Sequence, residues 1–420
     1  MKVFKFGGGV LRTSKDIDQL KNILKDHQND QLIIVVSAFN KITSKLERLL
    51  NTFYECENFD KELYDEIKAY HIKYSSELYT KNFTEEDLSE YFEEIQFIFK
   101  NGLSENYHYN YDKVVSFGEI LSSRIVYEAL RPYFEGIEYY DARKLILTDS
   151  VYTEAKVEWE ESVKRIREHC LNDNKKIIIT QGFIAADKNG DTTTLGREGS
   201  DFTASILAYA VDADEVVFWK EVDGVYNADP QKTESYDLLP KLSYKESVEQ
   251  AFYGAKILHP KTIKPLQNKS IPIKVKPFLK PSENGTDIID ISELSPDAYP
   301  NMPIYIIKED QLLLSLSTLD FSFISENNLG KIFNLLSKHR VKVNLMESSA
   351  ISFSVCVNND KYKIPGVMKA LRKEFKLRYN DGLSLITIRH YTDKAIEKMI
   401  SEKTVLIKQS SRHTVRFVVK

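Results

Sequence analysis

The chain has 420 residues, of which 58 are Lys or Arg and 62 are Asp or Glu, so its formal net charge at neutral pH is −4. With 42% hydrophobic residues, a chain of this length can bury more than one core, which predicts two or three domains. The near balance of charge provides no broad positive field, which argues against a nucleic-acid partner.

The cysteines Cys56, Cys170 and Cys356 are scattered and lack CxxC spacing, so they indicate neither a disulfide framework nor a zinc site. They favour a reducing compartment. The N-terminal residues lead directly into an expected strand without an apolar signal segment. No apolar run reaches the roughly 18 residues of a membrane span. We therefore expect a soluble, cytoplasmic protein.

The N-terminal part of the chain is typical of a strand–helix–strand unit. Val3–Phe6 is a mostly apolar segment that predicts a buried strand, and Thr13 with Asp16 forms a capping pair for the helix that follows. Leu32–Val36 is a β-branched run of the kind that fills the middle of a parallel sheet. Together they predict a βαβ unit.

Apolar residues then recur at helical spacing from about residue 45 to 110, as in Leu63, Ile67 and Tyr70. We interpret this stretch as a helical excursion that packs on the sheet, and assign it no chemistry. Further segments are expected as strands at Val114-Val115, Ile177–Thr180 and Glu215–Trp219, and as a helix at Phe202–Val211.

Six of the twelve prolines fall between Pro272 and Pro303, which predicts a domain boundary near residue 300. The expected domains are therefore residues 1–300 and 301–420. In the second, the pattern predicts two βαββ units. They comprise strands at 312–317, 341–345, 351–357, 384–389, 405–409 and 414–419, and helices at 329–338, 364–375 and 393–400. The second unit lacks room for a final helix and strand before Lys420.

Consecutive glycines follow the first strand. The amides of Gly7, Gly8 and Gly9 can point into one concavity and bind an anion, and Lys5 adds a point charge. Taken alone, a glycine turn between a strand and a helix also has a purely steric explanation. The segment is neither a Walker loop nor a dinucleotide-binding fingerprint.

The segment Thr194–Asp201 places an arginine and an aspartate around two glycines before the expected helix. Arg197 could hold a carboxylate in a bidentate fork and Asp201 could pair with an ammonium group, which together describe a site for an amino acid. The alternative is an ordinary helix N-cap at Ser200 or Asp201 with a surface ion pair. The local sequence leaves both interpretations open.

Two further segments carry candidate side chains. Lys220–Pro230 begins at a strand end, where ligands dock in α/β sheets, and continues into two turn signals. In Tyr253–Pro260, Lys256 falls in a break between two helices, where it could bind phosphate or simply be solvated. We interpret His259 as a structural turn residue rather than a base.

Seven motifs, in this order, resemble those of the aspartate kinases over essentially the whole chain. They are KFGG at 5–8, VVSAFNKIT at 35–43, SFGEILSSR at 116–124, QGFIA at 181–185, TTTLGREGSDFTA at 192–204, VDGVYNADP at 222–230 and YGAKILHP at 253–260. The LGR-x-GSD and GAK-x-LHP pair separates aspartate kinases from acetylglutamate, glutamate-5 and uridylate kinases of the same superfamily.

The resemblance implies an α/β fold, a three-layer amino-acid-kinase sandwich around a mostly parallel sheet, followed by an α+β region of tandem ferredoxin-like ACT modules. It implies transfer of the γ-phosphoryl group of MgATP to the β-carboxylate of L-aspartate, the first step of lysine, threonine and methionine biosynthesis. A carboxylate is already an anion at neutral pH, so no general base is required. Magnesium would be held largely by ATP oxygens, so no protein ligand is named.

The resemblance also implies residue roles. Catalytic residues would be Lys5, Asp201 and Lys256. The nucleotide would be bound by Lys5, Gly7, Gly8, Gly9, Lys220, Glu221, Tyr226, Gln231 and Lys256. Aspartate would be bound by Thr43, Glu119, Arg197, Ser200 and Asp201, with Arg197 on a carboxylate and Glu119 and Asp201 near the α-ammonium group.

Several positions depart from the family pattern, and all lie on the nucleotide side or beside it. Val10 follows the glycines where the family has a hydroxyl residue, and Lys220-Glu221 replaces a Thr-Asp pair. Gln231 replaces an arginine, and Asn40 and Ser44 replace a glycine and an asparagine. A weakly active or inactive paralogue that serves as an amino-acid-binding regulatory subunit is therefore the alternative. The retained Lys5, Gly7, Gly8 and Lys256 favour activity, and a kinase for another small amino acid ranks last.

Because ACT modules pair edge to edge, we expect at least a homodimer with amino-acid effector sites formed by both protomers. The candidate pocket is the loop Ser325–Leu329 facing Val343–Ser348. Asn327 and Asn344 stand where the family has a glycine and an acidic residue. The resemblance is closest to the monofunctional kinases inhibited by lysine, but these two changes argue against such inhibition and leave weak or absent sensitivity to lysine as the alternative.

Overall fold

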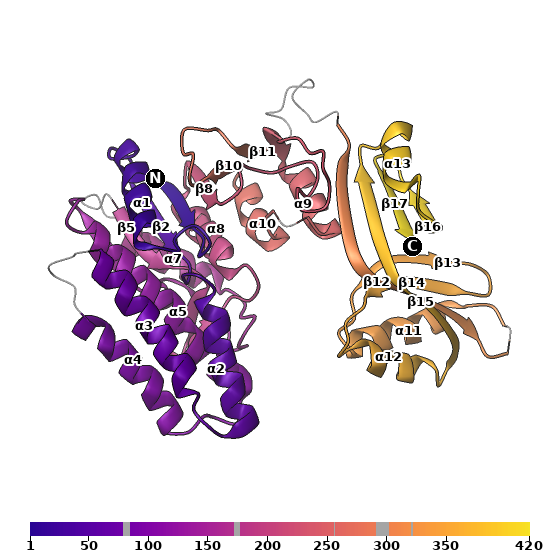
Figure 1. The fold of residues 1–420 in the computed structure, drawn as a ribbon, viewed down its shortest axis with the longest axis horizontal. Helices are drawn as coiled ribbons and strands as arrows, with labels where there is room; N and C mark the ends of the chain where they lie inside the picture. Colours follow the sequence, from indigo (N-terminus) through magenta and orange to yellow (C-terminus); the bar gives the residue numbers. More distant parts are fainter. Residues whose placement is uncertain (79–84, 172–176, 256, 291–301, 321) are drawn as a thin grey trace. The chain divides into compact units, whose positions relative to one another are not determined.

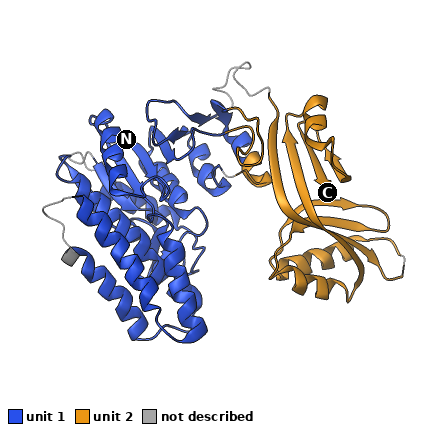
Figure 2. Ribbon diagram, in the orientation of Figure 1, with its two compact units in different colours: residues 1–225, 238–248, 257–299 blue, residues 226–237, 249–256, 300–420 orange. Residues whose placement is uncertain are grey.

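The computed structural model describes residues 1–78, 85–171, 177–255, 257–290, 302–320 and 322–420. The chain forms two compact units. The first comprises residues 1–225, 238–248 and 257–299, and the second comprises 226–237, 249–256 and 300–420 (Figure 2). The boundary predicted near residue 300 falls in 291–301, outside the described residues. Within the described ranges, no helix is long and apolar enough to cross a membrane.

The first unit is built on an eight-stranded sheet with the order β3-β5-β2-β1-β8-β10-β11-β9. Its strands are β1 (Lys2–Phe6), β2 (Leu32–Val36), β3 (Ile137–Tyr140), β5 (Ile177–Gln181), β8 (Glu215–Lys220), β9 (Lys241–Ser243), β10 (Ile273–Pro277) and β11 (Thr286–Ile289). Only the β10–β11 pair is antiparallel. The central strands β1, β2 and β5 are buried almost throughout because helices cover both faces, as the β-branched run of β2 predicted.

Helices pack on both faces of this sheet, so the unit has three layers (Figure 1). The helices of this unit are α1 (Ser14–Asp26), α2 (Ile42–Cys56), α3 (Lys61–Glu77), α4 (Glu85–Lys100), α5 (Tyr107–Leu130), α6 (Ala142–Leu145), α7 (Trp159–Cys170), α8 (Gly199–Val211), α10 (Pro260–Asn268) and the first part of α9 (Tyr244–Tyr253), whose residues 249–253 belong to the second unit. Helices α1 to α5 bury their apolar sides in one core with Phe4, Phe6 and Ile34. Helix α8 packs against β1, β2 and β8, and α7 and α10 pack against α8. A small sheet joins β4 (Leu147–Thr148), β6 (Ile184–Asp187) and β7 (Thr192–Thr194).

The predicted helical excursion is confirmed as α2, α3 and α4, but the strand expected at Val114-Val115 is wrong. Both valines lie within α5, which is buried along almost its whole length from Asn110 to Leu130. A helix that is buried all round shows no polar face, so a short β-branched pair within it looks the same as a strand.

The second unit contains an antiparallel six-stranded sheet with the order β13-β14-β12-β15-β17-β16. The strands are β12 (Ile304–Thr318), β13 (Val343–Ser348), β14 (Phe353–Asn358), β15 (Phe375–Arg389), β16 (Val405–Ser410) and β17 (Thr414–Val419). The helices are α11 (Glu326–Lys338), α12 (Ile364–Leu371) and α13 (Asp393–Ile400).

Strands β12 and β15 are longer than the sequence predicted because each serves both halves of the sheet. The C-terminal half of β12 pairs with β14, while its first residues, Ile304–Lys308, pair with Leu385–Arg389 of β15. The start of β12 therefore supplies a strand beside the second βαββ unit, whose own chain ends at β17. The helix expected at 364–375 stops at Leu371, and Phe375 instead begins β15.

Candidate active site

The predicted motifs meet at one edge of the parallel sheet. The strand register places Phe6 opposite Val36 and Trp219, and Val36 opposite Gln181, so the carboxyl ends of β1, β2, β5 and β8 are level. The glycine loop, the Ser37–Thr43 segment and Lys220 all follow these strand ends. Ligands of open α/β sheets bind at this edge.

The glycine loop after β1 lies tightly against the loop after β2. A Cβ on Gly8 would lie 1.9 Å from the Ala38 carbonyl oxygen, and Asn40 N donates to Gly8 O at 3.1 Å. A Cβ on Gly9 would lie 2.6 Å from Glu221 Oε2. Gly8 is therefore required for the close approach of the two loops, whereas the Glu221 side chain beside Gly9 can move.

A buried aspartate holds two lysines at the same edge. Lys5 Nζ on β1 lies 2.6 Å from Asp201 Oδ1 on α8, and Lys220 Nζ at the end of β8 lies 2.9 Å from Asp201 Oδ2. Burial opposes ionisation of Asp201, but Lys220 and Lys5 outweigh it and hold its pKa well below the usual range. Burial lowers the pKa of Lys5, with Asp201 acting in the opposite direction. The three groups carry a net positive charge beside the glycine loop.

The alternative that Ser200 or Asp201 is an ordinary N-cap is wrong. The N-cap of α8 is Glu198, in the left-handed region at φ 54°, and its side chain makes no capping hydrogen bond. Ser200 and Asp201 lie in the first turn, and Ser200 packs on Gly182, where a Cβ would be 2.5 Å from Ser200 Cβ. Arg197 is exposed, and none of the described residues forms an ion pair with it.

Glu119 is a buried carboxylate that is only half satisfied. Its Oε1 accepts from Ala38 N and from Thr43 Oγ1, each at 3.4 Å, whereas Oε2 has no hydrogen-bond partner in the described part of the chain. Burial raises the pKa of Glu119 to about 8. A buried carboxylate with a free oxygen favours a cationic partner such as an ammonium group.

Helix α5 places Glu119 by packing closely on the loop after β2. A Cβ on Gly118 would lie 3.0 Å from Ala38 Cβ, and Ser122 Oγ accepts from Phe39 N at 2.9 Å. The motifs SFGEILSSR and VVSAFNKIT, which are distant in sequence, are therefore in direct contact in the fold. The first carries the carboxylate, and the second forms the loop that it faces.

Sequence reasoning missed two features of this edge. The resemblance placed Lys220 among the nucleotide-binding residues, but nothing in the sequence predicted its ion pair with Asp201. Asp112 on α5 gave no local signal, yet it accepts from Thr194 N and Thr153 N, both at 2.9 Å, and from Thr194 Oγ1 at 2.6 Å. It thereby fixes the strand that leads to Arg197.

The other predicted residues lie as follows. Glu221 pairs with Arg12 at the surface. Tyr226 and Gln231 belong to the second unit, where the Tyr226 ring packs 5.0 Å from that of Tyr236. Lys256 lies outside the described residues. His259 caps α10, since its Nδ1 accepts from the Lys261 amide at 3.2 Å, which confirms its interpretation as a structural residue.

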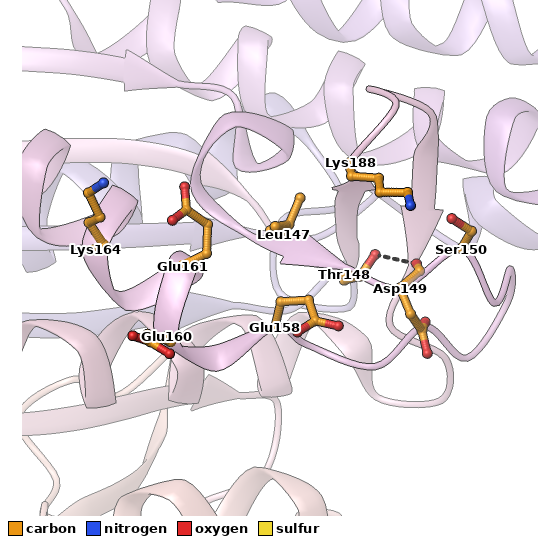
Figure 3. A pocket seen from close by; sticks show the side chains of 9 residues that line it. All are labelled: Leu147, Thr148, Asp149, Ser150, Glu158, Glu160, Glu161, Lys164 and Lys188. Atoms are coloured by element: carbon orange, nitrogen blue, oxygen red, sulfur yellow. Dashed lines mark hydrogen bonds between the residues drawn. The ribbon is translucent and has the colours of Figure 1, made fainter.

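A surface pocket of about 830 Å³ is lined by none of these residues. It lies between β4 and α7 and is lined by Leu147, Thr148, Asp149, Ser150, Glu158, Glu160, Glu161, Lys164 and Lys188 (Figure 3). Its carboxylates do not converge, and no group of three or more possible metal ligands occurs among the residues that the structure describes. We therefore place the candidate site at the sheet edge.

The sequence of this chain is similar to an established enzyme family and to several of its members. The amino acid kinase family matches residues 1–277. Lysine-sensitive aspartokinase 3 of Escherichia coli K12 is 28% identical over 397 residues, which cover 92% of this chain and 86% of that protein. A bifunctional aspartokinase/homoserine dehydrogenase of Buchnera aphidicola is 29% identical over 400 residues, 91% of this chain but only 47% of that protein.

Solved aspartokinase structures match the whole chain. E. coli aspartokinase III in complex with lysine and aspartate superposes with a TM-score of 0.82 at 25% identity, covering 100% of this chain and 96% of the other. Aspartate kinase of Clostridium acetobutylicum gives a TM-score of 0.81 at 25% identity, with the same coverage. Both matches extend through the C-terminal antiparallel sheet.

Proposed function

We propose that this chain, which belongs to the amino acid kinase family, is an aspartate kinase. It transfers the γ-phosphoryl group of ATP to the β-carboxylate of L-aspartate, giving 4-phospho-L-aspartate in the first step of lysine, threonine and methionine biosynthesis. The observation that carries this proposal is the convergence at one sheet edge of a net positive lysine–aspartate–lysine group and a half-satisfied buried carboxylate. The aspartokinase relatives support the choice of acceptor.

Lys5 and Lys220 act on the phosphates. Charge in phosphoryl transfer spreads over the equatorial oxygens of the transferring group, and cations fixed nearby stabilise that charge without reorganising. Asp201 orients both ammonium groups toward one place, since each of its oxygens holds one lysine. Asp201 is therefore a positioning residue, and Lys5 and Lys220 are the groups that meet the nucleotide.

Glu119 and Arg197 orient the amino acid. The free Oε2 of Glu119 receives the α-ammonium group and the exposed guanidinium of Arg197 receives a carboxylate, with Thr43 and Ser200 beside them. Two charged anchors fix the remaining carboxylate for in-line attack. That carboxylate is already the nucleophile, so no base is needed.

Magnesium enters with ATP in this proposal. Both oxygens of Asp201 are engaged by lysines, and within the described ranges no three acidic, histidine or cysteine side chains converge. Mg²⁺ commonly keeps several waters and binds through substrate phosphates with few protein ligands, so this donor set fits a metal held chiefly by ATP. When bound, the ion neutralises phosphate charge.

The test is a coupled ADP-release assay with MgATP across amino acids. We expect turnover with L-aspartate and little with L-glutamate, because the added methylene would displace the acceptor carboxylate. The Lys5→Met variant serves as the control for ADP release that does not come from the kinase site. Binding of aspartate and ATP without turnover would instead identify the inactive paralogue, and turnover with a different amino acid would identify another substrate.

We infer that the second unit is the regulatory part. Its two βαββ halves match the C-terminal region of the aspartokinase structures, one of which contains lysine. The effector of this chain, if an amino acid, would bind near α11 and β13, as the sequence predicts.

A further inference from the structure

The second unit contains positive charge that its own carboxylates do not balance. Lys308 on β12, Lys342 just before β13 and Arg416 on β17 form what we call the cationic cluster. Burial and the positive charges of Lys342 and Arg416 lower the pKa of Lys308 to about 8. Burial likewise lowers the pKa of Arg416. The three cations are therefore close enough to repel one another.

Two cations of the cluster donate hydrogen bonds to uncharged oxygens. Lys308 Nζ donates to Asn344 Oδ1 at 3.1 Å, and Arg416 Nη2 donates to the Asn344 carbonyl at 2.6 Å. The Asn344 amide nitrogen is used by Gln311 Oε1 at 2.8 Å and Asn358 Oδ1 at 2.7 Å. Arg416 Nε is buried and has no acceptor among the described residues. Lys308 and Arg416 thus retain unused donors.

Nearby carboxylates are committed elsewhere. Glu309, next to Lys308 in sequence, pairs with Lys232 at 2.8 Å, and Glu249 on α9 pairs with Arg389 at 3.4 Å. In the described part of this unit, no acidic side chain forms an ion pair with the cationic cluster. Lys308 and Arg416 are partly buried and Lys342 is exposed, so the charge of the cluster is left to be balanced by an anion from solution.

The last turn of α9, which belongs to the same unit and is drawn in orange in Figure 2, carries two aromatic side chains that lie beside the cluster. The Tyr253 ring lies 5.0 Å from Arg416 Cζ, and the Phe252 ring lies 5.3 Å from Lys342 Nζ. A Cβ on Gly254 would be 2.3 Å from Lys308 Cε, so only glycine leaves room for that lysine. The two rings meet edge to face, at an interplanar angle of 74°, so they form an angled aromatic wall beside the cations.

We propose that the cationic cluster is a binding site for a small organic carboxylate, which bridges the Arg416 guanidinium and Lys308 Nζ and lays its carbon skeleton against Tyr253 and Phe252. Arginine pairs bidentately with carboxylate and phosphate alike, but the two aromatic rings favour an anion that carries a carbon skeleton over inorganic phosphate. Two anionic ends would engage Lys342 as well, so a dicarboxylate fits best.

Ligand binding at this site should affect the kinase reaction, because one chain segment contributes to both sites. This consequence rests on the proposed function. Gly254 and Ala255 directly precede Lys256, which the sequence predicts to bind the nucleotide. A carboxylate that changes the position of Lys308 changes what Gly254 packs against. Occupancy should therefore alter the KM for ATP more than the KM for aspartate.

The test uses thermal unfolding and calorimetry of the full chain in a buffer of low ionic strength, with succinate as the probe and L-aspartate and inorganic phosphate as separate arms. The variants Lys308→Gln and Arg416→Gln keep a donor for Asn344 but remove the charge. Lys338→Gln, exposed on α11, is the matched control. Arg197→Gln removes the carboxylate anchor of the proposed active site.

We expect the Tm of the native chain to rise with the logarithm of succinate concentration. Lys308→Gln and Arg416→Gln should each weaken succinate binding about 10- to 100-fold, while Lys338→Gln and Arg197→Gln retain it. Without added anion, the two charge-removing variants should unfold at the same Tm as the native chain or higher, because repulsion is relieved. A purely structural role would lower their Tm.

Three results would overturn the proposal. They are an equal succinate effect in all variants, a response to phosphate alone, and binding of aspartate alone that Arg197→Gln abolishes. The last would place the ligand at the kinase site. Because binding is measured directly, a chain without kinase activity would still support or overturn the carboxylate site.

Discussion

Glu119 shows how one residue can oppose folding and serve binding. Its Oε2 is buried without a partner in the described part of the chain, and its pKa of about 8 lies far above the ordinary 4.5. The folded state therefore binds a proton that the unfolded state releases between these two pH values. Stability from this group is present below pH 4.5 and is lost as the pH rises through about 8.

We predict that Glu119→Gln separates these effects. The free energy of unfolding of the native chain should fall relative to that of the variant as the pH is raised from about 5 to 8. The KM for aspartate should rise about 10- to 100-fold, since the ammonium group loses a charged acceptor. Denaturant unfolding across pH and steady-state kinetics measure the two. A variant with unchanged KM would remove Glu119 from the substrate site.

The same carboxylate predicts proton release on binding. At pH 7 Glu119 is mostly protonated in the free protein, and the ammonium group of aspartate favours its ionised form. Calorimetric titration of aspartate in buffers of different ionisation enthalpy should show release of a proton, a signal that Glu119→Gln loses. Equal proton release by both proteins would contradict this assignment.

Lys220 distinguishes this chain at a position where its resemblance predicts threonine. We predict that Lys5→Met lowers kcat about 100- to 1000-fold and that Lys220→Thr lowers it at least about tenfold, with little change in the KM for aspartate. Because both lysines hold Asp201, their effects should not be additive. Lys2→Met, at the opposite end of β1, is the control. Native turnover in Lys220→Thr would make that lysine a structural counterion only.

At the scale of elements, sequence reasoning succeeded where a pattern is local. The capping pair Thr13 and Asp16 and the apolar face behind it give α1, and α13 begins and ends where its pattern does. Sequence reasoning failed where burial or long-range strand pairing determines the structure. Val114-Val115 lies in a helix buried on all sides, and β12 and β15 are lengthened by their mutual pairing, a long-range contact that no local window contains.

The candidate site divides in the same way. The glycine loop and LGREGSD carry their residue types in sequence, so Lys5, Asp201 and Arg197 could be identified from motifs. The Lys220–Asp201 ion pair and the Asp112 hydrogen bonds connect elements distant in sequence, and nothing in either segment alone predicts them. The family resemblance identified Glu119 as a site residue. Only the packing of α5 explains why one of its oxygens has no partner in the described part of the chain.

The approach of two loops yields a prediction for Gly8. Gly8→Ala places a Cβ 1.9 Å from the Ala38 carbonyl, so the loops after β1 and β2 must separate. We expect a loss of about 1–3 kcal/mol in stability and at least about a tenfold fall in kcat. Gly330→Ala in α11, where a Cβ meets nothing within 4 Å, should instead add about 0.5–1 kcal/mol. Chemical denaturation compares the two, and equal behaviour would refute the packing argument.

At the scale of the whole molecule, the second unit predicts self-association. Its sheet ends in β13 and β16, and an exposed edge strand offers unpaired backbone groups to another chain. Met346 on β13 is 49% exposed. We expect a homodimer by light scattering, weakened by Met346→Lys but not by Leu319→Lys, which lies in an exposed turn. A monomeric native chain would contradict edge pairing.

The sensitivity of the kinase to feedback inhibition by lysine is also predicted at the scale of the whole molecule. Asn344 stands where the resemblance predicts an acidic residue, and Lys308 and Arg416 donate to it, so the surroundings of β13 repel an ammonium group. An inhibitor must bind better to a less active state, and lysine gains no charged partner there. We therefore expect little inhibition when lysine, threonine or methionine is titrated into the kinase assay at millimolar concentration, in a chain that remains dimeric. Strong inhibition by lysine would show that another carboxylate replaces the missing one. No inhibition by any of the three, together with a monomeric mass, would remove the regulatory role from the second unit.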